Sequence, residues 1–263
     1  MPTVVFILGG GHSGSTLLGM ILGTNKDATC LGEFKHIDSV LIKDKLKKVQ
    51  KSGYCSTCGN HCRVWDTFPR EGNPFVNADR VFGSEFLVDT SKYLNWFNRC
   101  MEDMPFPYKI VRLARDPKDR FGSFRRRRGK LSDEEVYCWV KREAAMTKFL
   151  EDKEHIICKY EDFANKRSIN KVCEFIGMKY DPSMYNYWEK LHHNMRGNVR
   201  TATLIQLKHG LLKPKDMSKT QRLFFEDVGF NVKHIDKSKY LTGSDLRMLK
   251  KHGVDKIEAQ LGY

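Results

Sequence analysis

A glycine-rich segment near the start of the chain has the residue types that bind phosphate groups. Gly9, Gly14 and Thr16 stand at the spacing of the nucleotide-triphosphate loop Gly-x4-Gly-Lys-Ser/Thr. Glycines let the backbone approach a ligand, and free amides at the start of a following helix attract anions. Ser15 replaces the lysine that reaches the β- and γ-phosphates, so a ligand with a single 5′-phosphate carrying a less charged group is predicted. A tight turn without a ligand is the weaker alternative.

Two side chains elsewhere could act on the group that such a loop would hold. Glu33 lies in the segment 30–34, which returns to the mouth of the loop if a strand ends there. Ligands of open parallel sheets bind outside the carboxyl ends of the strands, so Glu33 is a candidate general base. Lys92 follows the apolar run 86–89 and is expected at the same edge. The alternatives are a solvated glutamate, which this loop alone favours, and an ordinary surface lysine.

Arginine and hydroxyl side chains supply candidates for a second anion site. Arg115 ends an apolar run and Ser123 follows eight residues later, so a guanidinium and a hydroxyl could hold one phosphate between them. The arginine run 125–128 is typical of a solvated helix face, part of which could touch an anionic acceptor. The late loop, residues 192–200, has two arginines and a glycine. It could cover a nucleotide as a lid, and a basic surface loop is an equal alternative.

Potential metal ligands are concentrated in one short segment, at Cys55, Cys58, His61 and Cys62. Cys-x-x-Cys is the usual half of a zinc knuckle, but the second half is missing, and the adjacent His61 and Cys62 are poorly placed to complete one tetrahedron together. A remote fourth ligand such as Cys30 or Cys100 is then needed. Three states stay open: a structural zinc site, a disulfide, and free thiols in a capped loop.

The alternation of strands and helices predicts the framework for these residues. Apolar, β-rich runs predict strands at 3–8, 86–89, 108–115 and 155–159. Helices are predicted from about Ser15, from Pro117, over 132–152 behind a capping box, and over 167–176. This order favours an α/β fold with a central parallel sheet flanked by helices and a P-loop-like strand–loop–helix at the N-terminus. We expect a single domain over residues 1–263.

Two further regions are predicted to be helical. Residues 37–50 are rich in lysine, with apolar positions at helical spacing, so an exposed amphipathic helix is expected. Residues 218–251 contain two more helical segments. Their expected buried contacts are Leu223, Phe224, Phe225, Leu246 and Leu249.

Composition limits the class of protein. With 40% hydrophobic residues among 263, the chain can bury a core, and its net charge of +14 favours anionic ligands such as nucleotides, sulfated or phosphorylated acceptors, nucleic acid or acidic membranes. Eight scattered cysteines are not a disulfide scaffold, so a cytoplasmic, reducing location is expected. No apolar run approaches the roughly 20 residues of a membrane span, and no leader precedes the first strand, so we expect a soluble, unprocessed chain.

Taken together, these motifs resemble those of sulfotransferases that use 3′-phosphoadenosine 5′-phosphosulfate (PAPS), from the first strand to the late loop. The family's 5′-phosphosulfate loop is similar to Gly11, His12, Ser13, Gly14, Ser15 and Thr16. Arg115 and Ser123 have the spacing of its 3′-phosphate pair. The resemblance implies contacts to adenine and the 3′-phosphate from Tyr160, Arg196, Gly197, Asn198 and Arg200. Each motif is weak alone, but jointly they are specific.

The resemblance is nearer to the tyrosylprotein and carbohydrate-type branches. Glu33 stands where these branches carry a glutamate base, which favours its catalytic interpretation, and Lys92 resembles a basic position near their bridging oxygen. His12 departs from the family, which usually has arginine or lysine there. A histidine with an ordinary pKa of about 6.5 is largely neutral at pH 7 unless a bound anion raises that pKa. Donor affinity is then expected to be greatest below the raised value and to decline above it.

The implied reaction is in-line transfer of a sulfuryl group from PAPS to an acceptor hydroxyl or amine, which leaves adenosine 3′,5′-bisphosphate. Glu33 would remove the acceptor's proton, and Lys92 with His12 would neutralise charge on the leaving phosphate. A sulfuryl group carries less charge than a phosphoryl group, so Mg²⁺ is not required and the missing loop lysine is explained. The expected partners are this nucleotide and an acceptor that carries a hydroxyl or an amine. The acceptor could itself be anionic, whereas nucleic acid is not expected.

Two other functions fit parts of the sequence. A P-loop kinase with a degenerate phosphate loop would use Asp89 as its Mg²⁺ ligand, but Ser15 argues against it. A nucleic-acid-binding protein would use the Cys/His knuckle, the lysine-rich segment and the arginine run, but it leaves the phosphate loop unexplained. The acceptor stays open among sugars, peptide tyrosines and small alcohols or amines.

Overall fold

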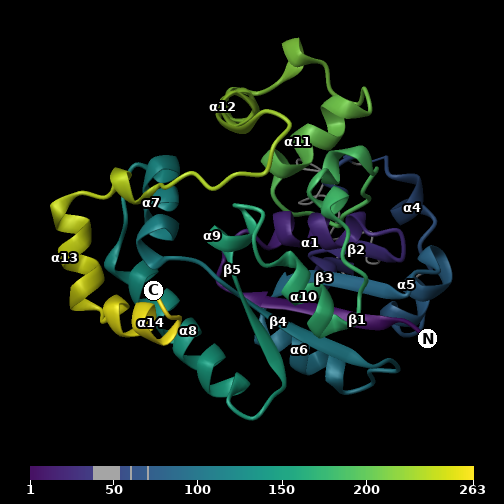
Figure 1. Cartoon of the computed structure of the whole chain (residues 1–263), viewed down its shortest axis with the longest axis horizontal. Helices are drawn as coiled ribbons and strands as arrows, with labels where there is room; N and C mark the ends of the chain where they lie inside the picture. Colours follow the sequence, from purple (N-terminus) through teal and green to yellow (C-terminus); the bar gives the residue numbers. More distant parts are fainter. Residues whose placement is uncertain (38–53, 60, 70) are drawn as a thin grey trace.

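A parallel sheet lies at the centre of the molecule (Figure 1). The computed structural model describes residues 1–37, 54–59, 61–69 and 71–263. Within them, five parallel strands lie in the order β2-β3-β1-β4-β5. Their bounds are Thr3–Gly9 for β1, Ala28–Gly32 for β2, Phe86–Lys92 for β3, Tyr108–Ala114 for β4 and His155–Lys159 for β5. The predicted parallel sheet is confirmed, while the helix expected over 37–50 lies, beyond Ile37, outside the described residues.

Helices connect the strands and cover both faces of the sheet. The longer helices are α1 (Ser15–Thr24), α5 (Pro74–Phe82), α6 (Leu94–Met101), α7 (Pro117–Arg128), α8 (Asp133–Leu150), α10 (Ile169–Ile176), α11 (Val199–Lys208), α12 (Lys219–Val228) and α13 (Gly243–Lys251). The shorter ones are α4 (Arg63–Asp66), α9 (Tyr160–Phe163), α14 (Val254–Gln260) and the 3-10 helices η1 (Phe34–His36), η3 (Pro182–Tyr185), η4 (Tyr187–Glu189), η5 (Pro214–Asp216) and η6 (Ser238–Tyr240). The predicted capping box before α8 is present, because Ser132 and Glu135 exchange side-chain to backbone hydrogen bonds.

Strand β1 is buried on both faces, as its uninterrupted apolar sequence predicts. Val5 and Ile7 pack into the core that contains α1, α10 and α11. Phe6 faces the other core, where its ring meets Phe75 of α5 and Phe97 of α6 edge to face. Figure 1 shows α1 and α6 on opposite sides of the sheet. Full burial of each such side chain contributes about 1.5–3 kcal/mol, so β1 is central to both cores.

Parallel pairing aligns the ends of neighbouring strands at one edge of the sheet. β1 pairs with β3 so that Leu8 lies opposite Lys92, and with β4 so that Gly9 lies opposite Leu113. β2 pairs with the other side of β3. The segments that follow these strands contain the candidate site residues, so the sheet brings them to one edge.

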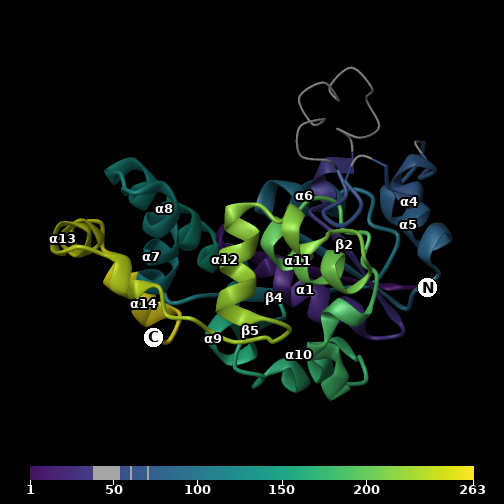
Figure 2. The same cartoon turned by 90° about the horizontal axis from the view of Figure 1, so that it is seen from above.

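The C-terminal third adds helices around this edge. Helices α13 and α14 share a core with α7 and α8, at the left of Figure 1, and α12 lies beside α11 in both views (Figures 1 and 2). Of the buried contacts expected here, Leu249 is buried and Phe224 and Phe225 are partly buried, but Leu223 and Leu246 are 44% and 45% exposed. Helical spacing predicted these helices, but it did not predict that α12 contains no fully buried residue. None of the helices in the described ranges is both long and apolar enough to cross a membrane.

Alanine substitutions at two glycines of the same loop should differ in their effect on stability, because only one of the two positions lacks space for a side chain. A Cβ at Gly9 would overlap the carbonyl oxygen of Leu113 on β4, whereas one at Gly11 would meet nothing within 4 Å. We expect Gly9→Ala to lower the free energy of unfolding by about 1–3 kcal/mol, because two paired strands must move apart. Gly11→Ala should change it by no more than about 0.5 kcal/mol. Urea unfolding of both variants measures this, and equal losses would contradict it.

Candidate functional site

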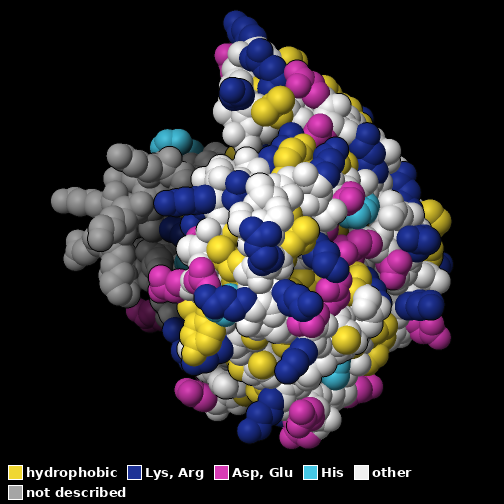
Figure 3. Space-filling view, turned by 90° about the vertical axis from the view of Figure 1, so that its left-hand side faces the viewer, with side chains coloured by type: hydrophobic (Ala, Val, Ile, Leu, Met, Phe, Trp, Pro, Cys, Tyr) yellow, Lys and Arg dark blue, Asp and Glu magenta, His cyan; other side chains and the backbone are white. Residues whose placement is uncertain are grey.

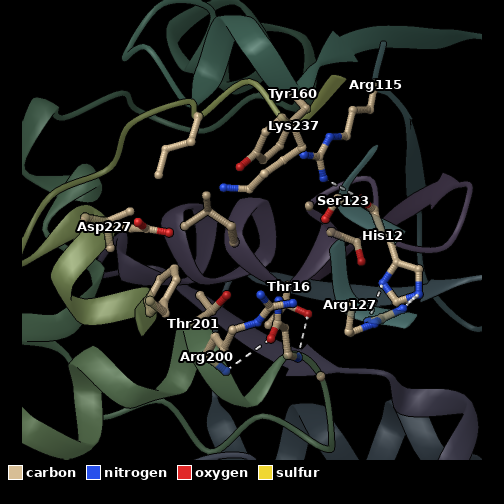
Figure 4. A pocket seen from close by; sticks show the side chains of 18 of the residues that line it. His12, Thr16, Arg115, Ser123, Arg127, Tyr160, Arg200, Thr201, Asp227 and Lys237 are labelled. Atoms are coloured by element: carbon tan, nitrogen blue, oxygen red, sulfur yellow. Dashed lines mark hydrogen bonds between the residues drawn. The ribbon is translucent and has the colours of Figure 1, made fainter. Parts of the chain in front are cut away.

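The strand ends meet at a cleft of about 790 Å³ (Figure 4). The residues predicted from the sequence that line it are Gly11, His12, Gly14, Ser15, Thr16, Glu33, Lys92, Arg115, Ser123, Tyr160, Gly197, Asn198 and Arg200. Two predicted residues do not line it. Ser13 is buried, and Arg196 donates its backbone N–H to the Tyr54 carbonyl at 2.7 Å. The fold therefore unites most of the predicted site from segments that are far apart in the sequence.

The phosphate loop, residues 9–16, offers backbone amides to the cleft. Among the residues that the structure describes, no side chain caps the first turn of α1, so its leading N–H groups have no side-chain partner there. Gly14 precedes the helix with a φ of 94°, and a Cβ there would overlap the Tyr160 ring. Thr16 Oγ1 accepts a hydrogen bond from the Asn198 backbone N–H at 3.0 Å, which fastens the late loop to the phosphate loop. Such an arrangement suits an anionic oxygen.

Arg115 is held in place by its neighbours. Its Nε and Nη2 lie 2.8 and 2.7 Å from Asp119 Oδ2, and its Nη1 donates to the His12 carbonyl at 2.7 Å. The guanidinium lies 4.2 Å from the centroid of the Tyr160 ring. Ser123, on the same helix as Asp119, lines the same part of the cleft (Figure 4). The remaining N–H groups of Arg115 are thus oriented in advance, so binding an anion costs little side-chain entropy.

Glu33 and Lys92 form an ion pair in the wall of the cleft. Lys92 Nζ lies 2.5 Å from Glu33 Oε1, while Lys35 and His36 lie 3.8 and 3.4 Å from Oε2. Burial opposes ionisation of Glu33, but the hydrogen bond from His36 and the charges of Lys92 and Lys35 outweigh it and lower its pKa to about 2. The carboxylate is therefore ionised at neutral pH, and it is a weak base as long as these contacts hold.

His12 is neutral in the free protein. Arg127 places Nη2 2.9 Å from His12 Nε2 and Nη1 3.4 Å from Nδ1. A guanidinium only donates hydrogen bonds and a neutral imidazole accepts at one ring nitrogen, so one of these two contacts is a hydrogen bond from Arg127 to His12. Partial desolvation, and then the charges of Arg127, Arg120 and Lys92, lower the pKa of His12 to about 3. The expectation of an uncharged histidine at pH 7 agrees with this geometry, and Arg127 supplies the fixed positive charge that His12 lacks.

One wall of the cleft comes from residues that were not assigned to the site from the sequence. Helix α12 and the segment after it contribute Lys219, Thr220, Leu223, Asp227 and Lys237. Figure 4 shows the Lys237 side chain reaching into the cleft. Arg126 and Arg127 line it from α7, so only part of the arginine run is a solvated face. The mixture of basic, hydroxyl and apolar side chains in α12 does not distinguish it from other amphipathic helices, so the sequence offered no specific signal for this wall.

Asp89, the candidate Mg²⁺ ligand of a kinase, instead accepts hydrogen bonds from its neighbours in the core. Its Oδ1 accepts from the Ser91 N–H at 2.7 Å and from the Ser91 hydroxyl at 2.5 Å, and its Oδ2 accepts from the Trp96 indole N–H at 2.5 Å. Asp89 is buried and does not line the cleft. This carboxylate fixes the end of β3, from which Lys92 reaches the cleft.

Of the four metal ligands predicted from the sequence, the three cysteines lie together and the histidine lies apart. A cluster with ligand atoms within 4.8 Å of one another consists of Cys55, Cys58, Cys62 and His193. His61 is exposed and is not a member, and neither Cys30 nor Cys100 supplies the fourth ligand. Three of the four candidate ligands named from the sequence thus lie together, and the histidine beside them is His193 and not His61.

Comparison with known proteins shows which solved structures have a similar fold. No family model and no curated protein matches the sequence. The sulfotransferase domain of the Synechococcus PCC 7002 olefin synthase is 16% identical, with a TM-score of 0.50 over 86% of this chain and 94% of that one. The sulfotransferase domain from the curacin biosynthetic pathway is 15% identical, with a TM-score of 0.50 over 86% and 97%. The chain therefore has a sulfotransferase fold.

Surface charge is mixed on the face that Figure 3 presents. Lysine and arginine side chains are interspersed there with aspartate and glutamate. The net charge of +14 is thus not gathered on this face into the basic stripe that is typical of nucleic-acid-binding proteins.

The neutral histidine makes stability depend on pH. The pKa of His12 is about 3 in the folded protein, whereas an unfolded chain protonates histidine at about 6.5. The unfolded state therefore binds more protons, and His12 destabilises the fold as the pH drops below about 6.5. We expect the loss of stability from pH 7 to pH 5 to be smaller in His12→Asn, measured by urea unfolding at each pH. Asparagine tolerates the φ of 68° at this position. Equal losses would mean that His12 protonates normally in the fold.

Proposed function

We propose that the protein transfers a sulfuryl group from PAPS to a hydroxyl or amine of an acceptor. The observation that carries this proposal is the convergence on one cleft of the phosphate loop, the Arg115 and Ser123 pair, the late loop and the Glu33–Lys92 pair. The sulfotransferase fold supports the same reaction class. In the transfer, a bond forms between sulfur and the acceptor atom, and the bond between sulfur and the bridging oxygen breaks.

Two parts of the cleft suit the two anionic groups of the donor. The open amides of the phosphate loop suit the 5′-phosphosulfate, and Arg115 with Ser123 suits the 3′-phosphate. Arg120 adds positive potential behind the loop. Its Nε donates to the Gly11 carbonyl at 2.9 Å, and its buried Nη1 has no hydrogen-bond partner among the described residues. Tyr160 borders the Arg115 guanidinium and is a candidate contact for the adenine.

The Glu33–Lys92 pair is suited to the chemical step. Glu33 accepts the proton of the acceptor hydroxyl or amine, and Lys92 stabilises negative charge on the leaving phosphate oxygen. Their mutual contact keeps Glu33 ionised before substrates arrive. When Lys92 turns to the leaving group, Glu33 loses its closest positive charge and becomes a stronger base. General base assistance of this kind contributes about 10²–10⁴-fold in rate.

Part of the charge neutralisation that the sequence suggested for His12 is assigned here to Arg127. A neutral imidazole can donate or accept a hydrogen bond but adds no positive charge. Arg127 lies within hydrogen-bond distance of both ring nitrogens and lines the cleft. A bound anion that raises the pKa of His12 would add a second charge at lower pH.

Donor binding should depend on Arg115. Adenosine 3′,5′-bisphosphate should bind the wild type without Mg²⁺, and Arg115→Ala should weaken binding about 10- to 100-fold, the effect of losing a charged hydrogen bond. Isothermal titration calorimetry measures both. Arg128→Ala is the control, because Arg128 pairs with Glu135 at 2.9 Å and does not line the cleft.

Three results would overturn this assignment. The first is a wild type that gives no heat with the bisphosphate. The second is an Arg115→Ala variant that binds as the wild type does. The third is thermal protection by ATP with Mg²⁺ but none by the bisphosphate, which would favour a kinase.

Glu33→Gln should separate binding from chemistry. The acceptor is first identified with labelled donor against sugars, tyrosine peptides, and small alcohols and amines. We then expect Glu33→Gln to lower kcat at least about 100-fold, while the Kd for the bisphosphate changes less than about 2-fold. Glu189→Gln, at a half-exposed carboxylate paired with Lys208, is the control for a lost surface charge. Unchanged turnover in Glu33→Gln would remove Glu33 as the base.

A further inference from the structure

We propose that Cys55, Cys58, Cys62 and His193 bind one structural zinc ion. The half knuckle seen in the sequence is completed by a histidine 131 positions beyond Cys62, on the late loop. The Sγ atoms of Cys58 and Cys62 each lie 3.3 Å from His193 Nδ1. The proposed transfer leaves this cluster unused, because none of its members lines the cleft.

The distances suit tetrahedral coordination. Zn–S bonds of about 2.3 Å and Zn–N bonds of about 2.0–2.1 Å place the nitrogen about 3.5 Å from each sulfur at tetrahedral angles. The observed 3.3 Å differs from this by a few tenths of an ångström. Thiolate and imidazole ligands select zinc over the oxygen-seeking ions Mg²⁺ and Ca²⁺. Four protein ligands leave no open position, so the ion has a structural and not a catalytic role.

The backbone around the cysteines already has the shape of a metal knuckle. Cys55 and Gly59 exchange backbone hydrogen bonds of 3.2 and 3.0 Å. The turn between them directs the Cys58 N–H at Cys55 Sγ, at 3.4 Å, and amide donors of this kind support a thiolate ligand. On the other side, the Trp65 indole N–H donates to the His193 carbonyl at 2.6 Å and fixes the histidine backbone. The ligands are therefore oriented by contacts outside the cluster.

Zinc explains the cluster better than the other two states of its cysteines. Cys55 and Cys62 are 1% and 0% exposed, so their sulfur atoms are shielded from water. A disulfide would use two of the three sulfur atoms and leave the third facing the imidazole. Free thiols would offer only weak hydrogen bonds to hold this arrangement. One ion engages all four groups at once.

The ion would link two segments that frame the cleft. Beside the cluster, Ser56 N–H donates to the Asn194 carbonyl at 2.9 Å, and Glu33 N–H donates to the Met195 carbonyl at 2.7 Å. Asn198, which binds Thr16, follows a few residues later. Metal coordination at His193 therefore restrains the loop that contacts both the proposed base and the phosphate loop. Because the unfolded chain rarely brings these four ligands together, zinc binding would add to the stability of the folded state.

Metal analysis and two histidine variants test the proposal. The full chain, purified without chelator, should contain one zinc per molecule, and X-ray absorption should show three sulfurs at about 2.3 Å and one nitrogen at about 2.0–2.1 Å. His193→Ala should contain well under one zinc per chain. His61→Ala is the matched control, because His61 adjoins Cys62 in sequence but stands outside the cluster, and it should keep its zinc.

Wild-type protein alone decides the matter if His193→Ala does not fold. Removal of zinc and addition of Co²⁺ should give the absorption bands of tetrahedral cobalt with thiolate ligands. The proposal is wrong if the wild type holds no zinc and takes up neither Zn²⁺ nor Co²⁺, if mass spectrometry finds a disulfide among the three cysteines, or if His61→Ala loses the ion and His193→Ala keeps it. These measurements use no nucleotide, so their failure leaves the proposed transfer untouched.

Discussion

Backbone pairing between the late loop and the edge strand β2 holds the site together. Met195 donates its N–H to the Leu31 carbonyl at 2.9 Å and accepts from the Glu33 N–H at 2.7 Å. Gly32 permits this approach, since its φ is 78° and a Cβ there would overlap the Met195 backbone. The late loop thus extends the sheet beyond β2 by one parallel bridge. Glu33 consequently leaves the strand in a fixed direction, toward Lys92.

The site also contains backbone that is costly to form. His12, Lys92 and Arg196 have φ values of 68°, 73° and 54°, in the left-handed region that residues other than glycine seldom adopt. Each such residue costs about 1–3 kcal/mol, so the surrounding contacts must supply the difference. Arg115 holds the carbonyl of His12, and Glu33 holds the side chain of Lys92. The two apolar cores that share β1 provide the stability on which these conformations depend.

Much of this arrangement follows from local sequence signals. The apolar runs of β3 and β4 predict strands, and the ends of parallel strands meet at one edge, so Lys92 and Arg115 could be assigned to one site. Glu33 follows β2, which no apolar run predicted, and only the family resemblance favoured it as a site residue. The wall formed by α12 could not, because its position depends on tertiary contacts and its spacing resembles that of any amphipathic helix. The metal cluster shows the same limit: His61 is adjacent in sequence, but only the fold brings His193 to the cysteines.

The open packing of α12 has a consequence for how one wall of the cleft can change. Helix α12 contains no fully buried residue, whereas the phosphate loop and Glu33 are built from the sheet and its first helix. Substitutions on the cleft side of α12 therefore cost little stability. The phosphate loop and Glu33 can stay constant while this helix is exchanged or redesigned, which makes the shape of this wall of the cleft an evolvable and engineerable property.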